Sequence, residues 1–287
     1  MRCTDKWLDY ELLDASNGER LERWGDIILI RPDTQIIWNT PKKDYRWNKA
    51  HARYIRSNSG GGHWEYYKKL DDTWNIRYDD LGFVIKPMGF KHTGVFPEQA
   101  INWDYATEKI KNANRPVNVL NLFGYTGGAT VACLKGGASV CHVDASKGMV
   151  NMAKENSVLS GVSDKPVRWI VDDCVKFVNR EIRRGRRYDA IIMDPPSYGR
   201  GPNGEVWKLE TELYPLLELC KQVLSEDPLF FLLNSYTSGL SPAVMEYTLS
   251  SVLKDTFTGK VSADEIGLRV SSTNLVLPCG NTAIWER

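Results

Sequence analysis

Five short apolar segments that alternate with helical stretches constrain the fold of this chain more than any other feature. They are VNVLNLF (117–123), ASVCHVD (138–144), VRWIVDD (167–173), YDAIIMD (188–194) and LFFLLNS (229–235). Strands that are apolar throughout are buried on both faces of a sheet, and helices between them let consecutive strands run parallel. The alternation therefore predicts an α/β fold built on a doubly wound parallel sheet.

The segments between and after these strands complete the expected fold. Helices are expected in GGATVACLKGG (127–137), SKGMVNMAKENSVLSG (146–161), CVKFVNREIRRG (174–185) and VWKLETELYPLLELCKQVLS (206–225). KVSADEIGLRV (260–270) and NLVLPCGNTAIWE (274–286) are expected to pair as two strands at one edge of the sheet. Another helix is expected to begin near Pro97, because proline suits the first helical turn.

The first part of the chain has a different pattern. GDIILIRPDTQIIW (25–38) and WNIRYDDLGFVIKPM (74–88) are short β-rich runs broken by Pro, Asp and Gly, which is typical of antiparallel strands. We therefore predict two domains, a small β-rich module at residues 1–88 and the domain of the parallel sheet at residues 89–287.

Composition excludes several classes of protein. The chain has 287 residues and a net charge of +1, which is compatible with a local basic patch. Its 6 cysteines form no CxxC pair, so no metal site is predicted and the thiols are expected to be reduced and mostly buried. No apolar run is long enough to span a bilayer and the N-terminus does not resemble a signal peptide, so a cytoplasmic protein without membrane segments is expected.

The residues that follow the predicted strands indicate a ligand site, because doubly wound folds bind ligands beyond the carboxyl ends of their strands. The first strand leads into FGYTGGAT (123–130), whose glycines would let a ligand approach the backbone. Asp144, Asp172, Asp173 and Asp194 end the next three strands. One glycine turn or one acid is often only a turn or a helix cap. Four consecutive strand ends of this kind favour a nucleoside-binding site.

The spacing of the glycines indicates which nucleoside cofactor is bound. Gly124, Gly127 and Gly128 do not form the GxGxxG pattern of dinucleotide-binding folds, and the GxxxxGK[ST] phosphate loop is also absent. A cofactor that has an adenosine but no phosphates, namely S-adenosylmethionine, fits better.

Residues 89–287 resemble the class I S-adenosylmethionine-dependent methyltransferases. Within that family they are similar to the branch that contains the bacterial large-subunit ribosomal RNA cytosine-C5 and guanine methyltransferases. The resemblance is carried, in the family's order, by FKHTGVFPEQ, NLFGYTGGATVACLKGGA, VDAS, DDCVKF and MDPPSYGRG. It implies a Rossmann-like sheet, S-adenosylmethionine as cofactor and RNA, specifically ribosomal RNA, as substrate.

The resemblance also implies roles for individual residues. Those implied to bind the cofactor are Thr93, Phe96, Phe123, Gly124, Tyr125, Gly127, Asp144, Ala145, Asp173 and Cys174. The glycine loop would wrap the methionine end, Asp144 would hold the ribose, and Asp173 would accept from the adenine amino group, with Asp172 as the alternative. Thr93 and Phe96 would help to cover the cofactor.

The predicted catalytic residues are Asp194, Pro195, Pro196 and Tyr198. Methyl transfer is an in-line displacement, so the main task of the site is to position the nucleophile. The two prolines restrict the backbone and aim the Asp194 carboxylate and the proline carbonyls at an amine or ring nitrogen. Enzymes that methylate base amines usually have an aromatic residue directly after the prolines. Ser197 stands there in this chain, so either Tyr198 or Trp207 is expected to stack on the target.

The target atom and the substrate class stay open at this stage. A cytosine-C5 enzyme needs a cysteine nucleophile, and Cys279 is a candidate only by elimination, since a buried cysteine in an edge strand is the simpler interpretation. The alternatives to an RNA methyltransferase are an enzyme that acts on a small molecule or a protein, and an inactive module that binds the cofactor.

Two basic clusters could contact RNA. PKKDYRWNKAHARYIR (41–56) interleaves cations with aromatic residues, as proteins that bind single-stranded RNA do. RNA contacts are predicted at Lys42, Arg46, Trp47, Lys49 and Arg53, and the alternative is a solvated segment anchored on its own module by tryptophan. REIRRGRR (180–187) precedes the fourth strand and is expected at the opposite, amino edge of the sheet as a solvated turn.

Overall fold

The computed structural model describes residues 1–57, 61–89, 91–200, 206–237 and 239–287. The chain divides into two compact units, Met1–Ile101 with Gly267–Cys279, and Asn102–Ile266 with Gly280–Arg287. These units differ from the predicted division after residue 88, because residues 89–101 and 267–279 group with the N-terminal unit. Backbone hydrogen bonds from Ser271 to Leu12 and from Ser272 to Leu13 attach the second of these segments.

The larger unit contains the predicted alternation of strands and helices. Its strands are β8 (Asn118–Leu122), β9 (Ser139–Asp144), β10 (Val167–Val171), β11 (Ala190–Met193), β12 (Tyr198–Arg200), β13 (Val206–Lys208) and β14 (Phe230–Ser235), and β15 (Lys260–Arg269) and β16 (Val276–Glu286) follow. Its helices are α1 (Ala100–Asn112), α2 (Gly128–Gly136), α3 (Lys147–Leu159), α4 (Cys174–Arg183), α5 (Leu209–Lys221) and α6 (Pro242–Leu253).

The central sheet confirms the doubly wound prediction. Its strand order is β10-β9-β8-β11-β14-β16-β15, with the two C-terminal strands at one edge as expected. β8, β9, β10, β11 and β14 run parallel to their neighbours in this group, and β16 is antiparallel to β14. The strand order reverses between β8 and β11. This switch point is where open α/β sheets bind their ligands.

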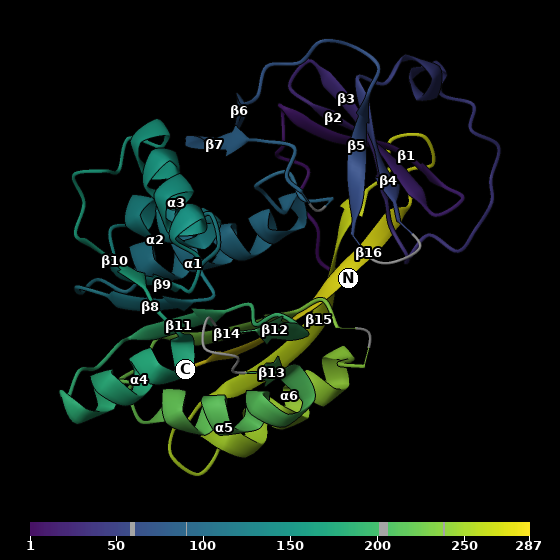
Figure 1. Ribbon diagram of the computed structural model, residues 1–287. Helices are drawn as coiled ribbons and strands as arrows, with labels where there is room; N and C mark the ends of the chain where they lie inside the picture. The colour runs from purple at the N-terminus through teal and green to yellow at the C-terminus, as the bar shows by residue number, and fades with distance from the viewer. Residues whose placement is uncertain (58–60, 90, 201–205, 238) are drawn as a thin grey trace. The chain divides into compact units, whose positions relative to one another are not determined.

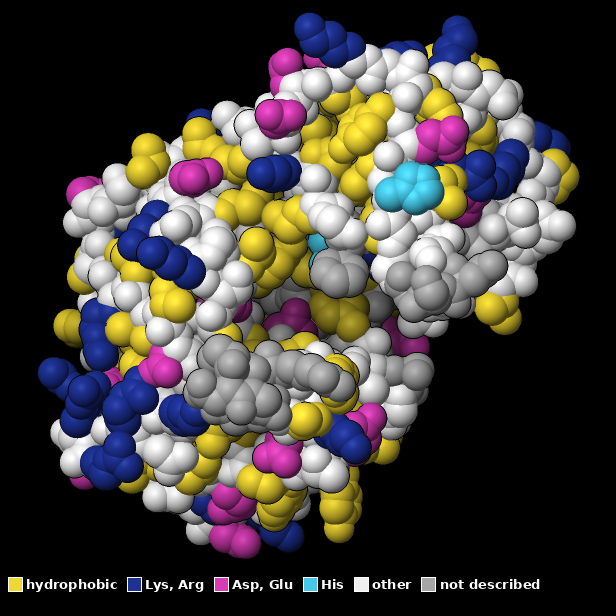
Figure 2. Space-filling model, viewed as in Figure 1, with side chains coloured by type: hydrophobic (Ala, Val, Ile, Leu, Met, Phe, Trp, Pro, Cys, Tyr) yellow, Lys and Arg dark blue, Asp and Glu magenta, His cyan; other side chains and the backbone are white. Residues whose placement is uncertain are grey.

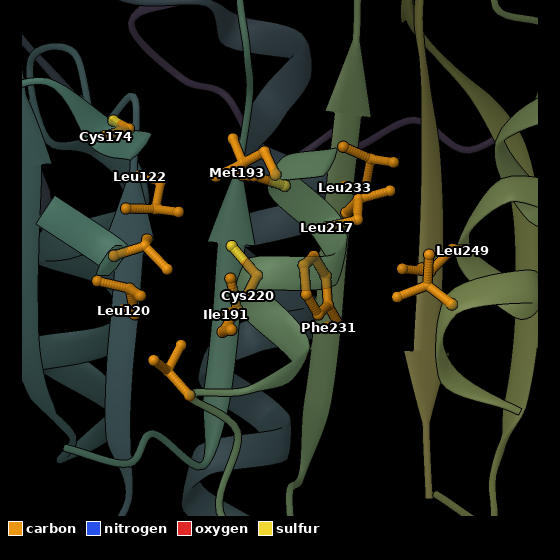
Figure 3. Close-up of a cluster of buried hydrophobic side chains, with 14 of the residues drawn as sticks. Leu120, Leu122, Cys174, Ile191, Met193, Leu217, Cys220, Phe231, Leu233 and Leu249 are labelled. Atoms are coloured by element: carbon orange, nitrogen blue, oxygen red, sulfur yellow. The ribbon is translucent and has the colours of Figure 1, made fainter. Parts of the chain in front are cut away.

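Helices cover both faces of this sheet (Figure 1), with α1, α2 and α3 on one side and α4, α5 and α6 on the other. Alternate residues of each strand point to opposite faces, so the pairs Leu120/Leu122, Ile191/Met193 and Phe231/Leu233 all enter the same core. Leu217, Cys220 and Leu249 from the helices pack against them (Figure 3). Burial on both faces explains why the strands are apolar throughout.

One predicted helix begins later than its sequence pattern indicates. Residues 206–208 form β13, which pairs antiparallel with β12. α5 then begins at Leu209, whose N–H donates to the carbonyl of Ser197 over 3.0 Å. The expected Gly/Pro/Asn loop at 201–205 lies outside the described residues. The hairpin keeps Trp207 next to the Asp-Pro-Pro segment.

The N-terminal unit is β-rich, as predicted. Its elements are β1 (Tyr10–Ser16), β2 (Glu19–Trp24), β3 (Ile27–Pro32), η1 (Tyr45–Lys49), β4 (Ala52–Arg56), β5 (Gly62–Tyr66), β6 (Trp74–Tyr78), β7 (Leu81–Ile85) and η2 (Pro97–Gln99). β1 to β5 form one sheet in chain order, and β6 pairs with β7. The prediction of antiparallel strands holds except for β3 and β4, which are parallel. A long connection that contains η1 permits this pairing.

Pro97 begins η2, a 3-10 turn that leads into α1, so the helix expected near Pro97 is present. Among the residues that the structure describes, no helix has the length and apolar character needed to cross a bilayer.

Candidate functional site

The loop after β8 has an unusual backbone. Phe123 and Tyr125 adopt φ values of 55° and 49°, in the left-handed region that side chains other than glycine seldom occupy. Such conformations concentrate at functional sites, where the surrounding structure holds them. Gly127 is also left-handed, with φ 82°, and is the N-cap of α2. The loop therefore presents backbone groups at the start of a helix, as the sequence predicts.

A side chain at Gly124 would not fit. A Cβ placed there would collide with the imidazole of His142, which is fully buried on β9. That ring is held by Thr130, whose Oγ1 lies 2.9 Å from Nδ1 and also accepts from Asn121 over 2.8 Å. Burial lowers the pKa of His142 to about 4, so the ring is neutral at physiological pH. The loop thus rests on a buried polar cluster that the sequence does not predict.

Asp144 holds the glycine loop from the end of the neighbouring strand. Its Oδ2 accepts from the backbone N–H of Tyr125 over 2.9 Å, and its Oδ1 accepts from that of Ser146 over 2.8 Å. Burial raises the pKa of the Asp144 carboxyl, and these two hydrogen bonds act in the opposite direction. Exposed Ala145 follows directly, so the predicted ribose and adenine positions lie beside the glycine loop.

The two acids after β10 have different partners. Asp172 forms an ion pair with Arg180, whereas Asp173 caps α4 by accepting from the N–H of Lys176 over 2.8 Å. The Sγ of Cys174 accepts from the N–H of Phe123 over 3.4 Å, which ties α4 to the glycine loop. Since the arginine engages Asp172, exposed Asp173 is the better candidate for an adenine contact.

Asp194 follows β11 at the switch point, next to the glycine loop that follows β8. The Nδ2 of Asn234 donates to its Oδ1 over 3.1 Å. Ser197, in the place where an aromatic residue is usual, pairs its hydroxyl with that of Thr237 at 2.5 Å. Tyr198 is 51% exposed on the β12–β13 hairpin. The segment thus combines a fixed carboxylate with an exposed tyrosine.

Trp207 connects the two loops of the switch point. Its Nε1 donates to the carbonyl of Pro196 over 2.6 Å. Its ring lies 5.3 Å from that of Phe123, with an interplanar angle of 54°. Because one loop follows β8 and the other follows β11, this indole lies where the glycine loop and the Asp-Pro-Pro segment meet. It is the stronger of the two aromatic candidates for stacking on a target.

Two of the predicted cofactor-binding residues belong to the other compact unit. Thr93 is fully buried there, and its Oγ1 has no hydrogen-bond partner among the described residues. The ring of Phe96 contacts that of His92 at 5.3 Å. Their role in covering the cofactor stays a prediction. Cys279 is buried in the same unit, and burial raises the pKa of its thiol well above the usual value, which does not suit a nucleophile.

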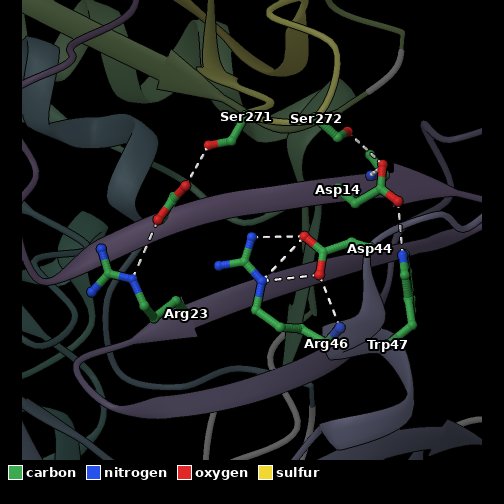
Figure 4. A network of polar contacts seen from close by, with 9 residues as sticks. Asp14, Arg23, Asp44, Arg46, Trp47, Ser271 and Ser272 are labelled. Carbon is green, nitrogen blue, oxygen red and sulfur yellow. Dashed lines mark hydrogen bonds and ion pairs between the residues drawn. The ribbon is translucent and has the colours of Figure 1, made fainter.

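The basic segment of the N-terminal unit is more structured than a free RNA-binding arm (Figure 4). Trp47 is only 8% exposed, and its Nε1 donates to Asp14, which also accepts from Ser272. Arg46 forms a close pair with Asp44, which lowers the pKa of that carboxyl. The anchored-tryptophan alternative therefore describes Trp47 correctly, so this indole cannot stack on a base without leaving its core.

The other predicted cations are less fully neutralised. Lys42 and Arg53 both pair with Glu19 at 2.7 Å, so one carboxylate serves two cations. The ammonium of Lys49 lies 5.1 Å from the centre of the Tyr45 ring. A hollow of about 600 Å³ opens beside these side chains, and it is lined by Ile30, Trp47, Asn48, Lys49, Ala50, Arg53, Tyr67 and Lys68.

The second basic cluster lies where the sequence predicts. α4 ends at Arg183 and β11 begins at Ala190, so the arginines between them stand at the amino edge of the sheet. Lys and Arg side chains gather over α4 in Figure 2. Arg168 and Arg184 both pair at 3.0 Å with the buried carboxylate of Glu181, which gives part of this cluster a structural role.

The chain matches a family model described as S-adenosylmethionine-dependent methyltransferase over residues 39–217. Its fold is similar to that of a SAM-dependent methyltransferase from Agrobacterium tumefaciens, with a TM-score of 0.92 and 36% identity over 99% of this chain and 92% of that one. SMU.776, solved in complex with SAH, is 18% identical with a TM-score of 0.73 over 98% of this chain and 76% of that chain, which shows the fold alone.

Two curated relatives are named as ribosomal RNA enzymes. Ribosomal RNA large subunit methyltransferase K/L of Shewanella baltica (strain OS155 / ATCC BAA-1091) is 33% identical over 71% of this chain and 28% of its own length. Ribosomal RNA large subunit methyltransferase I of Aeromonas salmonicida is 36% identical over 37% of this chain and 26% of its own length. The chain thus spans about a quarter of each relative's length. The family match and the Agrobacterium structure nevertheless agree over most of this chain, and the chain belongs to the S-adenosylmethionine-dependent methyltransferases.

Proposed function

We propose that this methyltransferase transfers a methyl group to a nitrogen atom of a base in RNA, with ribosomal RNA as the substrate. The observation that carries the proposal is the Asp194 carboxylate, held by Asn234 at the switch point beside Trp207. The names of the Shewanella and Aeromonas relatives support a ribosomal RNA substrate. An RNA substrate also agrees with the cytoplasmic location expected from the sequence.

The site suits S-adenosylmethionine. The left-handed backbone at Phe123 and Tyr125 and the close packing of Gly124 on the His142 ring hold the loop in one conformation at the start of α2, where backbone N–H groups can face a ligand. We assign the methionine end to Phe123, Gly124, Tyr125 and Gly127, the ribose to Asp144, and the adenine to Ala145, Asp173 and the Cys174 backbone. When bound, the cofactor supplies an electrophilic methyl group on a sulfonium.

The chain's own task is to place a nucleophile in line with that methyl group. An amino or ring N–H of the base would donate to the Asp194 carboxylate. Because the carbonyl of Pro196 already accepts from Trp207, we assign the role of second acceptor to the carbonyl of Pro195. The Trp207 ring would stack on the base, a contact worth about 1–3 kcal/mol.

The cysteines favour nitrogen over carbon C5 as the methylated atom. Methylation of a pyrimidine at C5 uses a thiolate nucleophile to activate the ring. Five of the six thiols, those of Cys133, Cys141, Cys174, Cys220 and Cys279, are buried, and burial raises the pKa of each. The more accessible Cys3 belongs to the N-terminal unit. A lone pair on nitrogen needs no such activation.

The basic hollow of the N-terminal unit supports an RNA substrate rather than a small molecule. Lys49, Arg53, Tyr67 and Lys68 line it, which combines phosphate-binding cations with an aromatic ring. We assign RNA contacts to this hollow and to Lys42 at the shared Glu19. Of the residues predicted from the sequence, Arg46 and Trp47 would contribute by shaping the segment.

The test is to supply labelled S-adenosylmethionine together with unmodified ribosomal RNA, transfer RNA, DNA or a protein extract. Label is expected in ribosomal RNA, and mass spectrometry of the digested nucleosides should find a base methylated on nitrogen. Asp194→Ala is the matched control, which should lose turnover while calorimetry shows nearly unchanged cofactor affinity. Label confined to transfer RNA, DNA or protein would refute the substrate, and a C5-methylated pyrimidine would refute the chemistry.

A further inference from the structure

Four polar side chains form a continuous row in the larger unit and end at Asp194. Asn102 donates from Nδ2 to the Oγ1 of Thr282 over 3.0 Å. Thr282 in turn donates to the Oδ1 of Asn234 over 2.7 Å. Asn234 then donates from Nδ2 to the Oδ1 of Asp194 over 3.1 Å. The first three side chains are between 0% and 3% exposed, in a sheet that is otherwise largely apolar.

Strand register creates this row. β11 and β14 are parallel with Met193 opposite Leu233, so the next residues, Asp194 and Asn234, are neighbours. β14 and β16 are antiparallel with Asn234 opposite Thr282. The first turn of α1 supplies Asn102 at the end of the row. A register shift of one residue in either pair would separate the groups.

The direction of the hydrogen bonds depends on the charge of the last member. An ionised carboxylate can only accept, so Asn234 must turn its amino group toward Asp194 and its oxygen toward Thr282. The threonine hydroxyl must then donate to Asn234 and accept from Asn102. Every donor in the row therefore points toward Asp194, an arrangement that stabilises the ionised acid more than the protonated one, because a hydrogen bond to a charged oxygen is stronger.

We propose that Asn234, Thr282 and Asn102 are positioning residues, which hold the Asp194 carboxylate ionised and in one orientation for the target nitrogen. The proposal rests on the proposed role of Asp194 in methyl transfer. Buried polar groups are costly unless each has a partner, and a complete row also fixes the rotamer of its last member. Of these three residues, Asn234 is the one that donates to Asp194, while Thr282 and Asn102 act through it.

Thr282→Val tests the row without changing a residue that touches Asp194, because valine keeps the shape and removes the hydroxyl. We expect kcat to fall about 10-fold, the KM for the cofactor to change less than about 2-fold, and the acid limb of the kcat–pH profile to move up by about one pH unit. Thr282→Ser keeps the hydroxyl and should recover most of the turnover. Thr107→Val is the matched control, since its hydroxyl donates to the Ala132 carbonyl over 3.1 Å and lies outside the row.

A second measurement, the NMR titration of Asp194, tests the row without an activity assay. The ¹³C carboxyl signal of Asp194, identified with Asp194→Asn, should titrate about one pH unit higher in Thr282→Val than in the parent protein. Asn102→Ala, one step further away, should shift it in the same direction by less, and it replaces Thr282→Val if that variant does not fold. An unshifted titration with unchanged kcat would overturn the inference. A parent protein inactive on RNA would refute the proposed function and leave this titration as the test of the row.

Discussion

The indole of Trp207 donates to the carbonyl of Pro196 over 2.6 Å while its ring contacts Phe123, so one side chain joins the Asp-Pro-Pro segment to the glycine loop. Ser197 has no ring to offer a target base and is paired with Thr237 instead. In the proposed mechanism, the aromatic surface for the target base comes instead from Trp207 on the β12–β13 hairpin.

Substitution of Trp207 should separate stacking from the hydrogen bond. Trp207→Phe keeps an aromatic ring and loses the N–H, so kcat/KM for RNA should fall about 10-fold, whereas Trp207→Ala loses both and should cost about 100-fold. Steady-state kinetics with labelled cofactor measure both variants. Tyr198→Ala, on the exposed side of the hairpin, is the comparison, because it removes the other candidate ring, and a larger loss there than in Trp207→Ala would show that Tyr198 provides the stacking surface.

Gly124 should be intolerant of any side chain. Gly124→Ala places a methyl group against the His142 ring, and we expect the free energy of unfolding to fall by about 1–3 kcal/mol and the cofactor affinity to fall about 10-fold. Chemical denaturation and calorimetry measure the two effects. A second substitution, His142→Ala, makes room and should recover part of the affinity. Gly148→Ala, where the nearest atom is 3.8 Å away, is the matched control and should be neutral or slightly stabilising.

Stability should fall as the pH is lowered, because His142 is buried in its neutral form. Its pKa is about 4 in the folded chain, below the ordinary value of 6.5, so between these values the unfolded chain holds a proton that the folded chain lacks. The neutral imidazole therefore makes its full contribution to the free energy of unfolding above pH 6.5. This contribution is lost as the pH falls toward 4, and the loss is at most about 3 kcal/mol.

Denaturation at neutral pH and at about pH 5 checks this dependence. His142→Gln should flatten it. His92→Gln should remove a separate part of the pH dependence of the free energy of unfolding, since burial also lowers the pKa of His92 to about 4. If His142→Gln keeps the full slope, the imidazole is not the group that titrates.

The salt dependence of RNA binding should identify the basic surface that contacts the substrate. Lys49→Gln and Lys68→Gln remove cations from the hollow, and each should reduce the slope of log K against log salt by about 0.7 for single-stranded RNA. Arg183→Gln and Arg186→Gln at the amino edge of the sheet are matched controls that remove the same charge. A reduced slope in these controls but not in the lysine variants would move the RNA interface to α4.

The strands and helices of the larger unit could be predicted well, because each is indicated by the pattern of neighbouring residues in the sequence. Apolar runs of five to seven residues reported burial on both faces, and the acids that end them, such as Asp144 and Asp194, fell at one edge because parallel strands share a direction. In the N-terminal unit one local signal was missed. Asn17-Gly18, with φ values of 53° and 73°, turns β1 into β2, and this pair favours such a hairpin turn.

Other features depend on residues that are distant in sequence. From its cationic neighbours in the sequence, Trp47 was predicted to contact RNA. In the structure its indole donates to Asp14 and lies in the core of the N-terminal unit. The start of α5 was displaced because β13 pairs with β12, and strand pairing overrode a helical pattern. Neither contact can be predicted from the spacing of neighbouring residues in the sequence.

The sequence by itself determined the doubly wound sheet, the glycine loop and the acids at the strand ends, because strand and helix periodicity and the direction of parallel strands are enough to place them. Only the tertiary structure decided what holds those acids. Asn102, Asn234 and Thr282 look like isolated polar residues in apolar surroundings. They become a row directed at Asp194 only when register aligns β11, β14 and β16 and α1 packs on that face, since buried hydrogen bonds depend on the three-dimensional position of both partners.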